Sequence, residues 1–336
     1  MDKHILLVTG GLGFIGKHFV RRVLEQGYNV INVDHMNYAA DVAANALFSE
    51  YKNYHFINED IAKLSFLPEC DYIVNFAAES HVDNSISSAT QFCLSNFMGV
   101  QRLLDLVRSK TPLERPVFIQ MSTDEVYGDI KNGRHTTDDD LKPSNPYSAT
   151  KAAADLLIKS YARTHKIQYK IIRPSNNYGC HQYPEKLIPK STLRMKRGLP
   201  ALMHGDGSYL RSWLHVEDTV DGILTVLQKG EINQIYNMCG DIELKNIEVM
   251  RKIAHILSVP EDKAWVCIEN RAGQDIRYSM DDSALRNLGW KPTRDFDVEL
   301  KKIVLSQNYT RFLNSKDDAQ EWAASLSASS DKARAA

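Results

Sequence analysis

The chain has 336 residues, of which 43% are hydrophobic and 25% are charged. At about 150 residues per domain, this length predicts roughly two domains. The 41 Lys and Arg residues nearly balance the 42 Asp and Glu residues, which argues against nucleic acid or an anionic membrane as the main partner. The 17 glycines and 11 prolines are ordinary in number, so fibrous and disordered classes are excluded.

The cysteines are odd in number and include no Cys-x-x-Cys pair: Cys70, Cys93, Cys180, Cys239 and Cys267. This pattern predicts neither a disulfide framework nor a zinc site, so we expect no metal. Reduced thiols are typical of a cytoplasmic protein. The first apolar run is too short for a signal peptide, and no segment reaches the roughly 18 apolar residues of a membrane span. The sequence therefore predicts a cytoplasmic protein with no membrane partner.

Short apolar runs alternate with longer amphipathic segments in the first half of the chain. The runs that we expect to be buried strands are 5–9, 29–34, 54–57, 71–76, 117–121 and 169–172. Between several of them lie helical patterns, at 14–26 and 90–109. This alternation predicts an α/β fold with a doubly wound parallel sheet of the Rossmann type, covered on both faces.

The pattern becomes irregular after about residue 173, where prolines interrupt it. We therefore predict a first domain over 1–175, with a return segment at about 213–240. A smaller mixed α/β domain is expected mainly within 176–322. The last stretch, 323–336, is rich in Ser and Ala and is expected to be a disordered tail.

A glycine-rich segment follows the first expected strand and opens the first helix: Thr9-Gly10-Gly11-Leu12-Gly13-Phe14-Ile15-Gly16. Its glycines allow a tight turn and a close approach to a diphosphate, which the N–H groups of a helix N-terminus can bind. Asp34 ends the second strand, where a carboxylate can hold a ribose 2′-hydroxyl and repel a 2′-phosphate. The alternative, an ordinary turn residue at Asp34, is weaker in this context. The pattern favours NAD over NADP.

Tyr147 and Lys151 are four residues apart in the helical pattern 146–165, so their side chains share one helix face. A tyrosine with a pKa of about 10 is a poor base at neutral pH. A neighbouring ammonium and a cationic nicotinamide stabilise its phenolate, which can then take a proton from an alcohol. Such pairs are common by chance, but after a dinucleotide-binding turn this one indicates an alcohol-oxidising site.

A third segment follows the strand at 117–121: Gln120-Met121-Ser122-Thr123-Asp124-Glu125-Val126-Tyr127-Gly128. It lies at the carboxyl edge of the expected sheet, where ligands of such folds bind. Together with the two motifs above, it resembles the extended short-chain dehydrogenase/reductase family, and within it the nucleotide-sugar 4,6-dehydratases. The resemblance covers about residues 5–290 and includes the shorter segments 77–83, 175–179, 184–189 and 205–207.

This resemblance implies an NAD-dependent enzyme that forms a 4-keto-6-deoxy sugar by internal hydride transfer from C4 to C6. Tyr147, aided by Lys151, would take the proton of the 4-hydroxyl. By resemblance, Glu125 is the base at C5, Asp124 is the acid at the C6 oxygen, and Thr123 hydrogen-bonds the 4-oxygen. Two adjacent carboxyl groups suit the acid and base roles because crowding separates their pKa values.

Matching positions imply further contacts. The cofactor is expected to contact Gly10, Gly13, Phe14, Ile15, Gly16, Asp34, Asp60, Ile61, Ala77, Ala78, Tyr147, Lys151 and Asn177. The nucleotide sugar is expected to contact Ser80, His81, Asn177, Glu185, Lys186, Leu187, Arg211, Asn237 and Arg271. The sequence departs from the dTDP-glucose pattern at His35, Asn37, Asn84, Cys180, His181, Ser212, Ala272, Gln274 and Ile276. The resemblance therefore favours dTDP-glucose as substrate and leaves UDP-linked sugars open.

Nucleotide-sugar 4-epimerases and UDP-glucuronate decarboxylases share the glycine turn and the Tyr147/Lys151 pair. Neither reaction needs an acid at a leaving group, so Asp124 discriminates against both. A third alternative is a non-catalytic NAD-binding sensor or scaffold, which would be expected to lose the tyrosine, the lysine or the acidic pair. Helical segments 90–109 and 148–165 resemble those that pair between subunits in this family, which implies a homodimer.

Overall fold

The computed structural model describes residues 4–306, which form two compact units. The first unit contains residues 4–177, 210–243 and 272–294, and the second contains the remaining described residues. The tail predicted at 323–336 lies outside the described residues. No helix within the described range is both long and apolar enough to cross a membrane.

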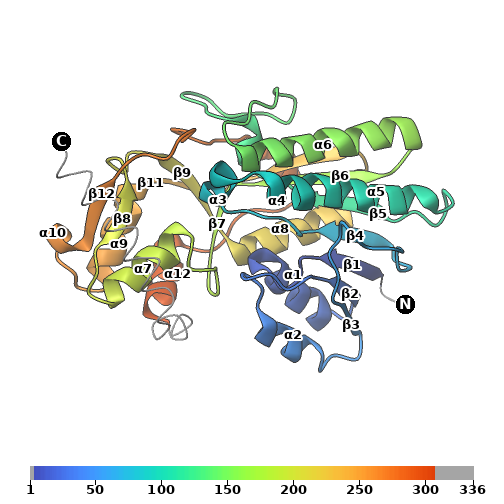
Figure 1. The fold of residues 1–336 in the computed structure, drawn as a ribbon, viewed down its shortest axis with the longest axis horizontal. Coiled ribbons are helices and arrows are strands. Elements are labelled where there is room, and N and C mark those ends of the chain that lie inside the picture. The colour runs from blue at the N-terminus through green and yellow to red at the C-terminus, as the bar shows by residue number, and fades with distance from the viewer. Residues whose placement is uncertain (1–3, 307–336) are drawn as a thin grey trace. The chain divides into compact units, whose positions relative to one another are not determined.

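The first unit is built on a seven-stranded parallel sheet in the order β10-β6-β5-β4-β1-β2-β3 (Figure 1). Its strands are β1 (Ile5–Thr9), β2 (Asn29–Val33), β3 (Tyr54–Ile57), β4 (Tyr72–Asn75), β5 (Val117–Met121), β6 (Tyr169–Pro174) and β10 (Gln234–Met238). The chain extends from β1 through β2 to β3 on one side and then returns to β4 on the other. Ligands in such sheets bind at the carboxyl ends of the strands beside this reversal. The predicted doubly wound sheet is confirmed.

Helices cover both faces of this sheet. They are α1 (Phe14–Glu25), α2 (Val42–Phe48), α3 (Val82–Ser87), α4 (Thr90–Phe92), α5 (Gly99–Ser109), α6 (Pro146–His165), α8 (Val216–Lys229) and α11 (Ser283–Asn287). Successive residues of a strand point to opposite faces. Leu6 and Val8 of β1 therefore pack with α1 and α8, whereas Leu7 packs with α5 and α6. Figure 1 shows these two pairs of helices on opposite sides of the sheet.

The helix predicted over 90–109 is interrupted. Between α4 and α5 lies a π-helical segment, η1 (Cys93–Met98), which contains the buried Asn96. The Asn96 side chain accepts a hydrogen bond from Glu79 N at 2.8 Å and donates to Glu79 O at 3.0 Å and to Thr150 Oγ1 at 3.0 Å. Short π-helical segments within α-helices are frequent at functional sites. Hydrophobic periodicity does not reveal the wider turn, because the flanking segments both have helical periods.

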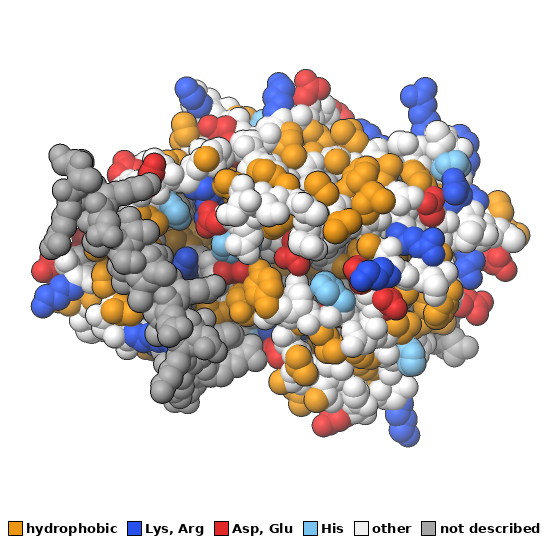
Figure 2. Space-filling model, viewed as in Figure 1, with side chains coloured by type: hydrophobic (Ala, Val, Ile, Leu, Met, Phe, Trp, Pro, Cys, Tyr) orange, Lys and Arg blue, Asp and Glu red, His pale blue; other side chains and the backbone are white. Residues whose placement is uncertain are grey.

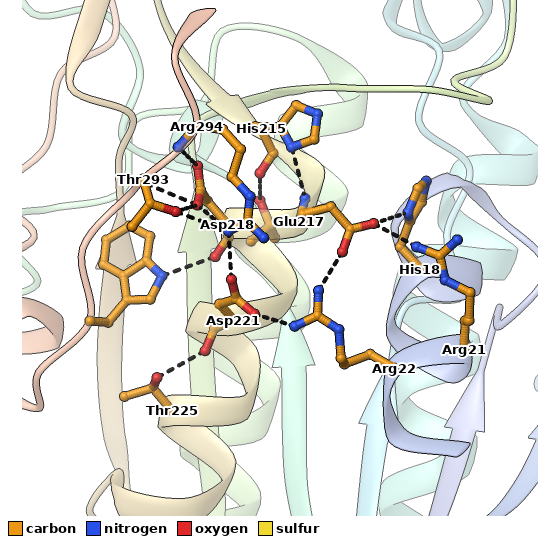
Figure 3. A network of polar contacts seen from close by, with 12 residues as sticks. His18, Arg21, Arg22, His215, Glu217, Asp218, Asp221, Thr225, Thr293 and Arg294 are labelled. Atoms are coloured by element: carbon orange, nitrogen blue, oxygen red, sulfur yellow. Dashed lines mark hydrogen bonds and ion pairs between the residues drawn. The ribbon is translucent and has the colours of Figure 1, made fainter. Parts of the chain in front are cut away.

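An ion-pair network joins α1, α8 and the segment that ends at Arg294 (Figure 3). Glu217 of α8 contacts His18 Nδ1 of α1 at 2.7 Å, and the buried Asp218 accepts from Arg294 at 2.7 Å. Burial raises the pKa of Glu217, but the hydrogen bond with His18 and the charges of His18 and two α1 arginines lower it to about 2. The segment 272–294, which falls in the range predicted for the second domain, thus clusters with the first unit.

The second unit is smaller. Its elements are α7 (Leu187–Lys196), β8 (Ala201–His204), α9 (Asn246–Ile256), α10 (Glu261–Ala264), β12 (Trp265–Ile268) and α12 (Phe296–Leu305). Strands β8 and β12 pair in parallel, while α7, α9 and α12 pack through fully buried residues such as Leu193, Ile253 and Leu300. A further sheet has the strand order β11-β9-β7. Its strand β9 (Leu210–His215) belongs to the first unit, and the chain passes from one unit to the other within β7 (Asn176–Tyr178) and within β11 (Ile242–Lys245).

Candidate active site

The glycine turn joins β1 to α1 beside the point where the strand order reverses. Gly10 has a φ of 68°, and a Cβ there would lie 2.6 Å from Ala77 N. A Cβ on Gly16 would lie 2.2 Å from Gly10 O, so both positions require glycine. Gly13 caps α1 without a side-chain hydrogen bond, which leaves the helix N-terminus to an anion. The structure thus brings together the predicted residues Gly10, Gly13, Gly16 and Ala77 in a cradle that fits a diphosphate.

Asp34 follows β2 and lies against the same turn. Its carboxylate accepts hydrogen bonds from Leu12 N at 3.0 Å and from Met36 N at 2.8 Å. These two bonds fix the carboxylate next to the N-terminus of α1, which no side chain caps, and there it is placed to accept a hydrogen bond from a ribose hydroxyl. Asp60, after β3, accepts from Ala62 N at 2.9 Å, and Ile61 is buried. The contacts of Asp60 and Ile61 with a cofactor stay predictions.

The first turn of α6 carries Tyr147. A capping box between Asn145 and Ser148, with proline at the start of the helix, fixes where α6 begins. The buried Tyr147 donates its backbone N–H to Ser85 Oγ at 3.2 Å, and its carbonyl accepts from Thr150 Oγ1 at 2.7 Å. Ser85, in α3, was not singled out from the sequence, because nothing in the local pattern distinguishes it.

Lys151 lies one turn further along α6, buried, with Nζ donating to the Met121 carbonyl at 2.6 Å. Burial lowers the pKa of Lys151 to about 8, and the charge of Asp155 opposes this. Burial also raises the pKa of Tyr147, as do the charges of Glu125 and Asp124, against a hydrogen bond with Thr123. The phenol is therefore protonated in the protein alone, and it needs neighbouring cations to become a base.

The acidic pair occupies a short 3-10 helix, η2 (Asp124–Tyr127), directly after β5. Thr123 caps it: its Oγ1 accepts from Glu125 N at 3.3 Å and donates to Asp124 Oδ1 at 3.1 Å. Asn145 Nδ2 donates to Glu125 Oε2 at 3.2 Å, which connects the pair to the start of α6. The structure therefore gathers Thr123, Asp124, Glu125 and Tyr147 in one place.

Asp124 is only 4% exposed, and its Oδ2 has no hydrogen-bond partner among the described residues. Burial, followed by the charge of Glu125, raises the pKa of Asp124 to about 7. A carboxyl group in this state holds a proton near neutral pH and can act as an acid. The raised pKa of Asp124 thus has a structural cause, the deep burial of its side chain.

Arg211 and Asn237, two expected substrate contacts, make internal contacts in the first unit. The buried Arg211 donates to Asp275 O at 2.8 Å and lies 4.5 Å over the Tyr278 ring. The buried Asn237 accepts from Tyr127 Oη at 2.8 Å and donates to Asp281 O at 3.1 Å. Both side chains thereby hold the segment that follows residue 272.

The other expected substrate contacts are divided between the units. His81 caps α3 by accepting from Asn84 N at 3.3 Å, and Ser80 lies in the loop before it, as does Ala78, an expected cofactor contact. Asn177 accepts from Thr219 Oγ1 at 2.5 Å. The remaining four residues belong to the second unit: Glu185, Lys186, Leu187 and Arg271. Their contacts with a ligand stay predictions.

Two buried charged residues beside the site were missed from the sequence. Asp155 Oδ2 accepts from Arg173 Nε at 3.0 Å and from Ser122 Oγ at 2.9 Å. A signal was present: Asp155 follows Lys151 by four residues, and Arg173 directly follows the apolar pair Ile171-Ile172.

The parallel sheet, the glycine turn and the Tyr147/Lys151 pair define the chain as an extended short-chain dehydrogenase/reductase. Its sequence matches the model of the GDP-mannose 4,6 dehydratase family over residues 7–303, and the chain belongs to that family. The predicted family resemblance is therefore confirmed.

Individual relatives agree with this assignment. The chain is 43% identical over 304 residues to the low-salt glycan biosynthesis protein Agl12 of Haloferax volcanii, covering 89% of this chain and 97% of that protein. It is 39% identical over 310 residues to dTDP-glucose 4,6-dehydratase of Streptomyces niveus, covering 89% and 91%. The crystal structure of DesIV, the dTDP-glucose 4,6-dehydratase of Streptomyces venezuelae with NAD and TYD bound, matches with a TM-score of 0.85 and 37% identity, covering 91% and 97%.

Proposed function

We propose that this protein is an NAD-dependent nucleotide-sugar 4,6-dehydratase that converts dTDP-glucose to its 4-keto-6-deoxy product. The names of the relatives confirm the predicted dehydratase class and agree with NAD as cofactor. One observation in this chain carries the proposal: Asp124, a carboxyl group only 4% exposed, lies beside Tyr147 and Glu125, and its burial raises its pKa. Neither C4 epimerisation nor decarboxylation needs such an acid.

Each catalytic residue has a proposed task. When bound, NAD would supply the hydride acceptor for C4 and the hydride donor for C6, so no external reductant would be consumed. The glycine turn and Asp34 would hold the dinucleotide. Tyr147, stabilised as phenolate by Lys151, takes the proton of the 4-hydroxyl, while Thr123 hydrogen-bonds the 4-oxygen.

The acidic pair then removes water. The 4-ketone acidifies the C5 proton, which Glu125 takes as a general base. Asp124 gives its proton to the C6 oxygen, which leaves as water, and Glu125 returns its proton to C5 when the hydride adds to C6. The two carboxyl groups thus need opposite protonation states, and the burial of Asp124 supports that division.

Substrate identity is tested by incubating the protein separately with dTDP-glucose, UDP-glucose and UDP-N-acetylglucosamine, followed by mass spectrometry and NMR. We expect dTDP-glucose to be consumed fastest, with the loss of one water. Faster consumption of UDP-glucose would overturn only the choice of nucleotide. A product of unchanged mass, epimerised at C4, would overturn the dehydratase assignment.

Cofactor choice gives a prediction at Asp34. We expect NAD to bind at least about tenfold more tightly than NADP, a difference of about 1.4 kcal/mol. Asp34 is held by two backbone N–H groups, so it cannot easily move away from a 2′-phosphate. Calorimetry on cofactor-free protein measures both affinities, and Asp34→Ala should narrow the gap. Equal affinities in the unmodified protein would refute the assignment.

A homodimer through α5, α6 and the residues before α5 is also proposed. Leu94, Met98 and Leu156 belong to these segments and are 46%, 45% and 55% exposed. Figure 2 shows hydrophobic side chains gathered on the face where Figure 1 draws α5 and α6. Apolar patches of this kind mark interaction surfaces, and a two-fold dimer would bury the same patch on both subunits.

Leu156→Arg tests the dimer by placing a charge in the proposed interface. We expect the variant to sediment as a monomer at concentrations where the unmodified protein is a dimer. Leu113→Arg, at a position that is 99% exposed and lies outside these helices, is the matched control and should leave the dimer intact. A dimeric Leu156→Arg variant, or a monomeric unmodified protein, would argue against this interface.

A cytoplasmic location is the last part of the proposal. It is supported by the cysteines, all five of which are in the described range and outside disulfides. Cell fractionation with an antibody to the protein measures it, and recovery mainly from a membrane or extracellular fraction would oppose it.

A further inference from the structure

A cluster of buried side chains adjoins the catalytic residues and has no task in the reaction described above. Asp155 and Arg173 are 0% and 2% exposed. Asp155 Oδ2 accepts from Arg173 Nε at 3.0 Å and from Ser122 Oγ at 2.9 Å. Asp155 lies on α6, and Ser122 directly precedes Thr123, so the cluster touches both elements that carry the site.

Lys151 and Asp155 are one helical turn apart on the same face of α6. Lys151 Nζ donates to the Met121 carbonyl at 2.6 Å, and the next residue, Ser122, donates to Asp155. The second carboxylate oxygen, Asp155 Oδ1, has no hydrogen-bond partner among the described residues. A buried ammonium with a carbonyl partner is costly unless a negative charge is near, and Asp155 supplies one.

The charges around this pair come from three elements. Arg173 and Tyr169 on β6 and Tyr127 on η2 interact electrostatically with Asp155, as does Lys151 on α6. Burial raises the pKa of Asp155, and the Arg173 guanidinium opposes this most strongly. Asp155 is also the charge that raises the pKa of Lys151 against burial. With Lys151, Arg173 and Asp155 all ionised, the cluster has one positive charge in excess, which a Tyr147 phenolate would balance.

Tyr147 faces acidic groups as well. Glu125 and Asp124 on η2 both raise its pKa, so they act against the phenolate. The cationic excess beside Lys151 is therefore needed when Tyr147 loses its proton.

The same cluster connects α6 to the acidic pair. Arg173 donates to Tyr127 Oη at 2.6 Å, and its guanidinium carbon lies 4.7 Å from the centre of the Tyr127 ring. Tyr127 is the last residue of η2, which begins with Asp124 and Glu125. The Asp155–Arg173 ion pair thus connects α6, which carries Tyr147, to η2, which carries the acidic pair.

We propose that Asp155 is a positioning residue that keeps Lys151 charged and seated on the Met121 carbonyl, so that Lys151 can stabilise the Tyr147 phenolate. This inference rests on the proposed role of Tyr147 and Lys151 in oxidation at C4. Because Asp155 is fully buried, it acts through Lys151 and not on the substrate.

The test is Asp155→Asn, which keeps the shape of the side chain and removes its charge. Protein carrying lysine labelled with ¹³C at the ε-carbon gives the titration midpoint of Lys151 by NMR, with Lys151→Arg to assign the signal. We expect the midpoint to fall by about one pH unit or more. The alkaline limb of the C4 oxidation rate should move by the same amount, so that the rate near pH 8 falls about fivefold.

Three further variants separate this role from a structural one. Asp218→Asn removes an equally buried, ion-paired carboxylate and should lower stability without moving the Lys151 midpoint. Asp155→Glu retains the charge and should keep the Lys151 midpoint close to that of the unmodified protein. Asp155→Ser also removes the charge and should lower the midpoint in the same way, which keeps the proposal testable if Asp155→Asn does not fold.

An unchanged Lys151 midpoint in folded Asp155→Asn, or in folded Asp155→Ser, overturns the proposal. The NMR titration needs no substrate. If the unmodified protein oxidises no nucleotide sugar, the proposed function fails, whereas the midpoints still decide the role of Asp155.

Discussion

Tyr147→Phe should lower the rate of C4 oxidation by about 10²- to 10⁴-fold, the usual cost of removing a positioned base. Phenylalanine keeps the ring that is buried at the start of α6 but cannot accept the proton of the 4-hydroxyl. Without that step, no 4-ketone forms and water cannot leave. The absorbance of reduced nicotinamide in a single turnover with dTDP-glucose measures the loss directly.

Tyr161→Phe is the matched control for this variant. Tyr161 lies on the same helix and donates its hydroxyl to Asp105 at 2.9 Å, away from the acidic pair. We expect it to oxidise the sugar at nearly the unmodified rate. If Tyr147→Phe also did so, another group would have to be the base.

Asp124→Asn should separate the two halves of the reaction. Oxidation at C4 depends on Tyr147 and Lys151, so reduced nicotinamide should still form in a single turnover. Loss of water should slow by about 10²- to 10⁴-fold, because an amide cannot protonate the C6 oxygen. In the unmodified protein, water loss should fall as the pH rises through about 7, where Asp124 loses its proton.

Glu125→Gln is the companion variant and should differ in one respect. It should also slow dehydration and, in addition, suppress exchange of the C5 hydrogen with deuterated solvent. If Asp124→Asn dehydrates at the unmodified rate, or Glu125→Gln exchanges C5 normally, the two roles are wrongly assigned.

The stability of Asp124→Asn provides a check on its fold. Burial raises the pKa of Asp124 from 3.8 to about 7, so its contribution to stability is present at low pH and is lost as the pH rises through 7. Relative to the unmodified protein, the variant should therefore gain up to about 4 kcal/mol in unfolding free energy between pH 4 and pH 8. Urea unfolding at both pH values measures this gain.

Much of the fold follows from local patterns. Each short apolar run from 5–9 to 169–172 became a strand of the parallel sheet, because these runs are rich in the β-branched and aromatic residues that favour strands. The π-helical segment η1 was not predicted, since Asn96 within it makes its contacts with Glu79 and Thr150, residues distant in the sequence.

The residues of the candidate site that local sequence relations reveal were predicted, and those that depend on long-range contacts were not. Tyr147 and Lys151 were found because a helix turn relates them, and the acidic pair because its two members are adjacent. Asp155 and Arg173 were not predicted as site residues, because their role depends on a hydrogen bond between α6 and β6. The internal contacts of Asn237 were equally hidden, since its partner Tyr127 is 110 residues away.

Internal hydride transfer is the central claim, and dTDP-glucose carrying deuterium at C4 tests it most directly. The product is analysed by NMR and mass spectrometry with no reductant added. We predict a 4-keto-6-deoxy sugar whose deuterium has moved to C6. Deuterium retained at C4 of an intact hexose, or lost to the solvent, would contradict the account.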